Sequence, residues 1–186
     1  MRSVAALRKL LLLAALSAVA ALLAGCAGLG GQPPLGDGGN GGQACALAPQ
    51  IGKPVDMAMF DLTNQGTAPV TVRSVSLPDA HGLAMTEAWL VPFNTRGPQL
   101  GVGQPFPPVT YPLWADRVPA AGAVIQPGRV LQLVFGVFLT TARDGTSDGP
   151  MVVYTAGRTT YTLRERFSLA AAHAKCVLFP PPPQVL

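Results

Sequence analysis

Charged, aromatic and histidine side chains are all scarce in this sequence, and each shortage narrows the functions that it can serve. Charged residues make up 12% of the chain and hydrophobic residues 49%, whereas intrinsic disorder needs the opposite balance. Only two histidines occur, His81 and His173, which is little material for a catalytic triad or a histidine-rich metal centre. One serine, Ser147, lies in a Gly-x-Ser-x-Gly pentapeptide, Gly145–Gly149, but this stretch is expected to be a hairpin loop between two strands and not the strand-to-helix turn of a catalytic serine. We therefore expect a folded domain that is not an enzyme and that carries no cofactor.

Positive charge is also scarce once the N-terminus is set aside. The formal charge of +4 includes Arg2, Arg8 and Lys9, and without these three residues ten basic side chains face nine acidic ones. The remaining arginines are scattered and form no basic stripe of the kind that phosphate backbones require. We therefore expect no nucleic-acid partner.

The N-terminus has the three-part layout of an export signal. Met1–Lys9 is basic, Leu10–Leu23 is apolar apart from Ser17, and the small residues Ala24 and Gly25 follow. The apolar run is about 14 residues long, shorter than the ~20 that a helix needs to cross a membrane. Residues 1–25 are therefore predicted to be a helical signal peptide that is cleaved.

The end of this segment, Leu23-Ala24-Gly25-Cys26, resembles the lipobox of bacterial lipoproteins. The resemblance implies that the Cys26 thiol receives a diacylglyceryl group before cleavage and that fatty acid such as palmitate anchors the protein. Two or three acyl chains give stable attachment. It further implies a place at the cell membrane, on the extracytoplasmic face, and Ala27 is compatible with the outer membrane of a two-membrane bacterium. The alternative is an ordinary secretory leader with a coincidental cysteine.

Composition divides the mature chain into three parts. Residues 26–43 are rich in glycine and are predicted to be a disordered tether, which spans roughly 20–25 Å. Residues 44–179 are predicted to form one β domain. Residues 180–186 include the run Pro180–Pro183 and are predicted to be an extended tail.

Short segments with an apolar-polar alternation of period two predict antiparallel strands. Val130–Leu139 is apolar on both faces except at Gln132, so we expect a central strand that is covered on both sides. The apolar phase slips near Arg73–Ser74, which predicts a bulge. Turns are expected at Asn64–Gly66 and Gln126–Gly128. The expected strands are Val55–Leu62, Val70–Leu77, Leu83–Phe93, Val130–Leu139, Met151–Ala156 and Tyr161–Ala171.

Phe60–Val72, followed later by Gln126-Pro127-Gly128 before an apolar strand, looks like the immunoglobulin-like sandwich domains of bacterial surface proteins. The resemblance covers residues 50–176 and implies an all-β, antiparallel sandwich of six or seven strands. Turn and strand signals of this kind indicate a fold and do not indicate a function.

Two cysteines remain once Cys26 is acylated. Cys45 precedes the first of these strands and Cys176 follows the last, in an oxidising compartment, so a disulfide is expected. The alternative, a redox-active or metal-binding pair, lacks the Cys-x-x-Cys spacing.

Pro98–Pro119 contains six prolines and is expected to be a long covering loop, because proline has no N–H to donate to a central ladder. Tyr111 and Trp114 lie in this loop. If these two aromatic side chains are exposed, they form a surface that a partner protein or ligand could bind. The alternative is that the loop folds its aromatic side chains over an open end of the sandwich.

Metal binding receives little support. Candidate Cu(I) ligands are Met57, Met59, His81 and Met85, and these residue types resemble the ligands of periplasmic copper chaperones. The paired His-x-Met element of those proteins is absent, and four residues of strand span ~13 Å. Asp144–Gly149 lacks the ligand pattern of a calcium loop and is expected to be a hairpin loop.

Together these observations predict a membrane-anchored lipoprotein with a non-enzymatic binding or structural role at the cell envelope. Its expected partners are the membrane, through Cys26, and an envelope protein. A copper-binding domain is the first alternative. An envelope enzyme with an unrecognised site in Pro98–Pro119 is the second, and it predicts a polar cleft in that loop.

Overall fold

The computed structural model describes residues 32–37 and 41–176. The expected signal peptide (1–25), the expected acyl acceptor Cys26 and the expected tail (180–186) lie outside the described residues. The described residues from Pro33 to Cys176 form one unit. Within the described part, no helix has the length and apolar character needed to span a membrane.

Almost all regular structure in the described residues is β-strand, with one 3₁₀ helix, η1, at Pro112–Asp116. Each of the six expected strands falls on observed strand, and the extra strands are two to six residues long. The strands are β1 (Leu35–Asp37), β2 (Gly42–Leu47), β3 (Val55–Asn64), β4 (Val70–Ser76), β5 (Leu83–Pro92), β6 (Val102–Pro105), β7 (Val118–Pro119), β8 (Val124–Ile125), β9 (Val130–Leu139), β10 (Gly145–Ser147), β11 (Met151–Ala156), β12 (Thr159–Arg164) and β13 (Phe167–Ala172).

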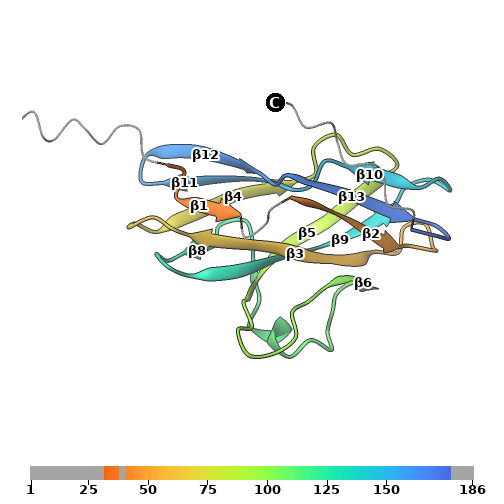
Figure 1. The fold of residues 1–186 in the computed structure, drawn as a ribbon, viewed down its shortest axis with the longest axis horizontal. Coiled ribbons are helices and arrows are strands. Elements are labelled where there is room, and N and C mark those ends of the chain that lie inside the picture. Colours follow the sequence, from red (N-terminus) through yellow and green to blue (C-terminus); the bar gives the residue numbers. More distant parts are fainter. Residues whose placement is uncertain (1–31, 38–40, 177–186) are drawn as a thin grey trace, which may run out of the picture. The chain divides into compact units, whose positions relative to one another are not determined.

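The strands form two layers around one core. The first layer has the strand order β1-β3-β9-β5-β7, and β6 pairs with the same edge of β3 as β1 does. The second layer consists of two sheets, β12-β11-β4-β8 and β10-β13-β2. Figure 1 shows β11, β12 and β13 in one layer and β3, β5 and β9 in the other.

The order of the strands along the chain identifies an immunoglobulin-like arrangement. Such a sandwich has strands A-B-E-D in one sheet and C-F-G in the other. Here β1-β3-β9-β5 takes the first order and β4-β11-β12 takes the second, in the correct chain sequence. The prediction of an all-β, immunoglobulin-like sandwich is therefore confirmed.

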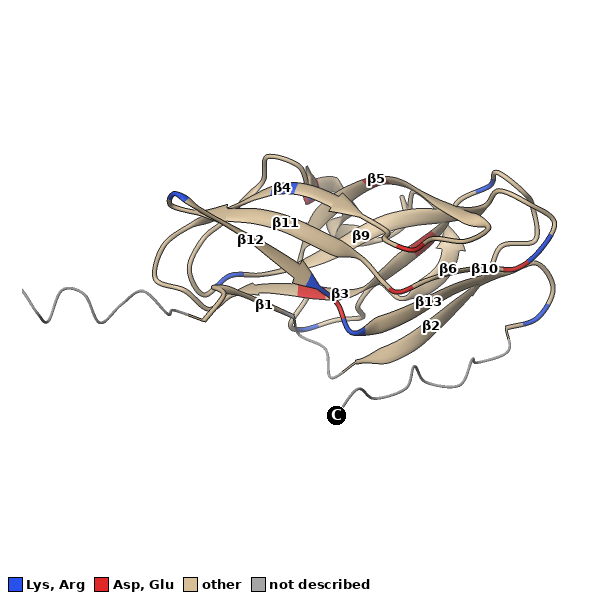
Figure 2. Cartoon of the chain, turned by 90° about the horizontal axis from the view of Figure 1, so that it is seen from above, with Lys and Arg blue, Asp and Glu red and all other residues tan. Residues whose placement is uncertain are grey.

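Inward-facing apolar residues of both layers fill the core. Phe60 of β3 and Phe135 of β9 stack with ring centroids 5.8 Å apart, and Phe167 meets Phe60 edge-on. From the second layer, the hydroxyl of the buried Tyr154 accepts the backbone N–H of Leu35 at 3.3 Å. Burying each large apolar side chain stabilises the fold by roughly 1.5–3 kcal/mol. The few charged residues lie mostly in loops and at strand ends (Figure 2).

The predicted bulge in β4 is confirmed. Val153 of β11 is opposite Ser74, and Tyr154 is opposite Val72, which leaves Arg73 as the extra residue. The two expected turns are also present. The Asn64 side chain accepts the Gly66 N–H at 3.0 Å, and Arg129 N–H donates to the Gln126 carbonyl at 3.1 Å.

The single strand expected over Tyr161–Ala171 is wrong, because the chain breaks at Glu165–Arg166 into β12 and β13. At the break, Glu165 is buried and its N–H donates to the Pro150 carbonyl at 3.2 Å instead of to a ladder. β12 pairs with β11, whereas β13 pairs with β10 and with β2. The odd positions are apolar on both sides of the break, with Glu165 as the exception, so periodicity alone joins the two strands.

The expected start of the domain at residue 44 is also corrected. Leu35–Asp37 pairs with the end of β3, and Leu35 is only 1% exposed. β2 begins at Gly42 and runs parallel to β13 in the other layer. Two short strands among glycines carry too little periodicity to be recognised, so the predicted tether includes residues that belong to the sandwich.

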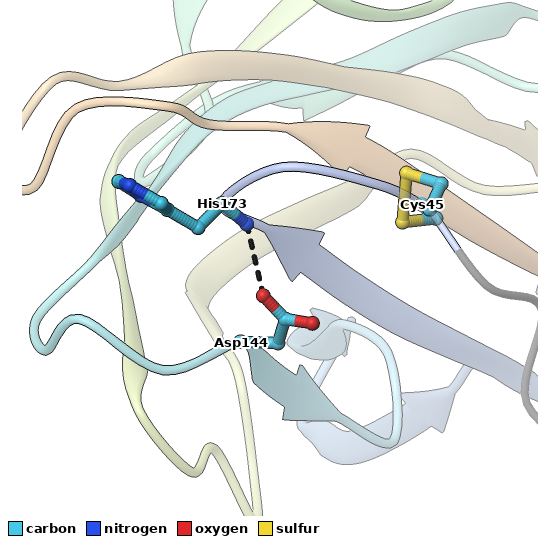
Figure 3. Close-up of a disulfide and its surroundings, with 4 residues drawn as sticks. Cys45, Asp144 and His173 are labelled. Atoms are coloured by element: carbon cyan, nitrogen blue, oxygen red, sulfur yellow. Dashed lines mark hydrogen bonds between the residues drawn. A yellow bond between two sulfur atoms is a disulfide. The ribbon is translucent and has the colours of Figure 1, made fainter.

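The expected disulfide between Cys45 and Cys176 is confirmed, with Cα atoms 5.7 Å apart. It joins β2 to the residues that follow β13 (Figure 3). Beside it, the Asp144 carboxylate accepts the backbone N–H of His173 at 2.9 Å.

The prediction that Asp144–Gly149 is a hairpin loop is wrong. The centre of this segment is strand β10, which pairs with β13.

Candidate functional site

The outer face of the first layer is covered by the long connection between β5 and β9 (Figure 1). A second apolar cluster lies under this connection, formed by Ala58, Val91, Leu100, Tyr111, Trp114 and Val134. The expectation that β9 is covered on both faces is thereby confirmed. The expected covering loop Pro98–Pro119 includes β6, η1 and β7.

Buried polar groups on the sheet attach this loop. The Gln132 side chain donates to the Leu100 carbonyl at 3.0 Å and also to the Ala58 carbonyl. The Asp56 carboxylate accepts the Gln104 N–H at 2.6 Å. Because buried polar groups are costly to leave without partners, these contacts fix where the loop lies.

Asp56 has the most perturbed environment of these groups. It is fully buried, and desolvation raises its pKa from 3.8 to about 6, while backbone N–H donors from Gln104 and Gly103 partly oppose the shift. Sequence reasoning missed Asp56 as an anchor. It did single out Gln132 as the polar interruption of an apolar strand, which is the available signal for such a group.

The aromatic residues of the loop point inward. The guanidinium of Arg117 lies over the rings of both Trp89 and Trp114, at 4.9 and 4.7 Å from their centroids, and the two rings meet edge-on. Its Nη1 donates to the Trp114 carbonyl at 2.9 Å. Phe106 meets Trp114 edge-on. This stack stabilises the loop through cation–π and packing contacts.

The predicted partner surface at Tyr111 and Trp114 is therefore wrong. Tyr111 is 8% and Trp114 4% exposed, and the Tyr111 hydroxyl donates to the Pro98 carbonyl at 3.3 Å. The alternative prediction, that the loop folds its aromatic side chains over an open end of the sandwich, agrees better with their burial. They cover the outer face of a sheet, however, and not an open end.

A groove of about 540 Å³ remains on the outside of the loop, and we call it the proline groove. Val109 on its rim is 71% exposed. The enzyme alternative predicts a polar cleft here, but carboxylate, histidine and cysteine side chains are all missing from the described lining. That lining is Pro98, Leu100, Gln104, Pro105, Pro107, Pro108, Val109, Thr110, Tyr111 and Pro112.

A second hollow, of about 440 Å³, is polar and includes His81, Asp79 and Asp148. His81 exchanges two backbone hydrogen bonds with Thr146, at 2.8 and 2.9 Å. Asp79 forms an exposed ion pair with Arg164 at 3.6 Å. Within residues 32–37 and 41–176, no three histidine, cysteine or acidic side chains are placed to hold a metal ion.

The four candidate copper ligands differ in their surroundings. Met57 is fully buried in the core, whereas Met59, at the irregularity of β3, is 51% exposed. Met85 is half-buried against the core, and His81 is exposed in the polar hollow. Met57 and Met59 therefore do not present their sulfur atoms to one solvent-accessible site.

No protein-family model and no curated protein matches this chain. Among solved structures, an ASH/PapD-like domain of human CEP192 is 14% identical, with a TM-score of 0.42, over 80% of this chain and 93% of that one. The Vibrio cholerae VesB protease is 11% identical (TM-score 0.38), over 73% of this chain and 31% of its own. The secreted serine protease VesC from Vibrio cholerae is 10% identical (TM-score 0.36), over 76% and 23%. Because these scores are low, the fold assignment rests on the strand order and not on these similarities.

Proposed function

We propose that this chain is a bacterial lipoprotein that is exported, acylated on Cys26 and held on the extracytoplasmic face of the membrane. Its sandwich domain has a non-enzymatic binding or structural role at the cell envelope. In a two-membrane bacterium, Ala27 favours the outer membrane as its location.

The disulfide is the observation that most supports this proposal. Structural disulfides persist in oxidising compartments outside the cytoplasm, and Cys45–Cys176 links the two ends of the domain. Because the chain has three cysteines, this pairing leaves Cys26 as the thiol that can accept a lipid. The basic and apolar segments before it, which resemble an export signal, support the same reading.

The proline groove supports a binding role more than a catalytic one. Its described lining is mostly proline and offers no carboxylate, histidine or cysteine for acid–base or nucleophilic chemistry. The loop is held by Asp56, Gln132 and the Arg117 stack, so its outer surface is presented in a fixed shape. A preformed surface binds at a lower entropic cost than one that must first be ordered.

Acylation is tested by expressing the full chain in a bacterium that is fed an alkyne-tagged palmitate. We expect label on the wild type and on the Cys45→Ser/Cys176→Ser double variant, which keeps Cys26, and none on Cys26→Ser. An unlabelled wild type, or equal label on Cys26→Ser, would refute the lipoprotein assignment.

The binding role is tested by cross-linking the acylated protein in its native membranes and identifying captured proteins by mass spectrometry. Val109→Asp places a charge on the rim of the proline groove. Ile51→Asp is the matched control, because Ile51 is 52% exposed on the turn between β2 and β3. We expect a reproducible partner that is lost in Val109→Asp and kept in Ile51→Asp. Turnover of an envelope substrate by the purified protein would contradict the non-enzymatic role.

A further inference from the structure

The first residues of the domain lie among the loops at one end of the sandwich. The Pro34 carbonyl accepts the Gln65 N–H at 2.7 Å, which joins the start of β1 to the loop at 65–69. Asn64 N–H donates to the Arg129 carbonyl at 3.1 Å, and Gly128 N–H donates to the Asn64 carbonyl at 2.8 Å. The turn at 126–129 therefore lies beside that loop.

A third turn belongs to the same end. Ala156, the last residue of β11, is opposite Val70, the first residue of β4. Val70 is in turn opposite Ile125 of β8, just before the turn at 126–129. The two-residue turn Gly157–Arg158 that follows Ala156 thus shares this end, on the left in Figure 1. We name the loops 65–69, 126–129 and 157–158, together with Val124, the anchor-side end.

The length of the chain ties this end to the lipid anchor. This step rests on the proposed function, in which Cys26 carries the acyl chains. Because the sandwich begins at Pro33, only six residues, 27–32, lie between it and Cys26, which makes seven Cα-to-Cα steps. A chain rises at most ~3.3–3.6 Å per residue, so Pro33 is within roughly 25 Å of the anchored cysteine in any conformation.

The chemistry of the anchor-side end suits an anionic bilayer surface. Its three loops contain Arg129 and Arg158 and no aspartate or glutamate, and Figure 2 shows a basic tip on the turn where β11 meets β12. Val124 is 51% exposed. Asp116, which lines a hollow together with Arg129, adds one acidic neighbour at its border. Cations beside exposed apolar groups favour contact with anionic headgroups.

The loops at the opposite end differ in composition. They carry three acidic residues, Asp79, Asp144 and Asp148, together with the basic residues Lys53 and Arg143, and Asp79 forms an ion pair with Arg164. Placing them against an anionic surface would bring carboxylates next to phosphate groups. Charge and chain length therefore favour the same orientation.

We propose that the anchor-side end docks on the phospholipid surface through anionic headgroups, so that the lipid anchor also orients the domain. The opposite end, with the Asp144–His173 contact, then faces away from the membrane. In this arrangement the sides of the sandwich, including the proline groove, stay accessible to a partner.

Amide hydrogen exchange of the full-length acylated protein tests this orientation. The protein is placed in vesicles of phosphatidylcholine alone or of phosphatidylcholine mixed with phosphatidylglycerol. We expect exchange at 65–69, 126–129 and 157–158 to slow when phosphatidylglycerol is present. Exchange at 77–82 and 140–144, at the opposite end, should stay the same.

Charge reversal supplies the matched variants. Each arginine near an anionic surface changes the ratio of docked to undocked protein by roughly fivefold, so Arg129→Glu/Arg158→Glu should lower it by more than about tenfold. The slowed exchange should then disappear. Arg143→Glu, at the opposite end, should leave it unchanged.

The outcomes separate this inference from the proposed function. The intact mass of the same sample reports acylation independently of exchange. Acylated protein whose anchor-side loops exchange equally in both vesicles, or whose opposite end is protected instead, overturns the docking proposal and leaves the lipoprotein assignment standing. Absence of acylation overturns both.

Discussion

Individual buried residues carry the attachment of the loop, and Asp56 has the largest energetic consequence among them. Its folded pKa of about 6 lies above the usual 3.8, so folding disfavours the ionised carboxylate. Between these two values the folded state holds a proton that the unfolded state has lost. The contribution of Asp56 to the free energy of unfolding is therefore fully present below pH 3.8 and is lost as the pH rises from 3.8 through about 6.

Asp56→Asn should remove this pH dependence. A shift of this size corresponds to about 3 kcal/mol at pH 7, so the wild type should lose up to that amount between pH 4 and 7 because of Asp56. The asparagine still has an oxygen for the Gln104 N–H, and at pH 7 we expect it to stabilise the protein by about 1–2 kcal/mol. Denaturant unfolding at several pH values checks this, with the exposed Glu87→Gln as control. Parallel pH profiles for wild type and Asp56→Asn would count against it.

Gly136 is a residue whose missing side chain is needed. A Cβ built there would lie 2.8 Å from ring atoms of Phe106 and 2.9 Å from Oγ1 of Thr86, which also accepts the Gly136 N–H. Gly136→Ala should therefore destabilise the domain by about 1–3 kcal/mol. Gly101→Ala, whose Cβ meets nothing within 4 Å, is the control and should change little. Equal free energies of unfolding for the two variants would contradict this packing.

At the scale of elements, apolar periodicity predicts long strands well and short ones poorly. β9 and β11 have their expected bounds, because ten and six residues of apolar pattern define them. β1 and β10, of three residues each, carry no detectable period. The break between β12 and β13 is set by new pairing partners, which local sequence does not encode. The information that the local sequence lacks is which strands pair with each other, and not the tendency of a segment to form a strand.

The candidate site was predictable as a loop but not as a surface. Six prolines in Pro98–Pro119 indicate a covering segment. Whether Tyr111 and Trp114 face outward depends on the sheet beneath them, where Val91 and Val134 supply an apolar face that needs cover. The outward apolar residues of β9 and the lone Gln132 are the signals in the sequence that point to this layer.

Gln132 should act at the scale of the whole loop. Gln132→Ala leaves the buried carbonyls of Leu100 and Ala58 without these donors, at a cost of about 1–3 kcal/mol. We expect faster proteolytic cleavage within residues 93–117, while the rest of the sandwich stays protected. The exposed Gln126→Ala serves as control. Cleavage rates equal to the wild type would show that the side chain does not hold the loop.

For the whole molecule, the disulfide closes the domain. It spans 131 residues, which in the chain-entropy model corresponds to about 5 kcal/mol, with native strain reducing the value. It joins Cys45 of β2 to Cys176, which follows β13, and β13 is the strand that pairs in parallel with β2. The disulfide thus holds a strand near the start of the sandwich to the residues that follow its last strand.

Cys45→Ser/Cys176→Ser should lower the free energy of unfolding by about 2–5 kcal/mol. Reduction of the wild type with dithiothreitol should produce a similar loss, and the reductant should have no effect on the double variant. Denaturant titration with and without reductant provides the measurement. A wild type whose stability is insensitive to reduction would contradict a structural role for this bond.

The central claim is that this domain is a lipoprotein anchored through Cys26. The most direct test is the intact mass, with N-terminal peptide analysis, of the mature protein extracted from bacterial membranes. The account predicts that residues 1–25 are absent and that the chain begins at Cys26 carrying a diacylglyceryl group. A mature chain that starts at another residue, or that begins at Cys26 without lipid, would contradict it.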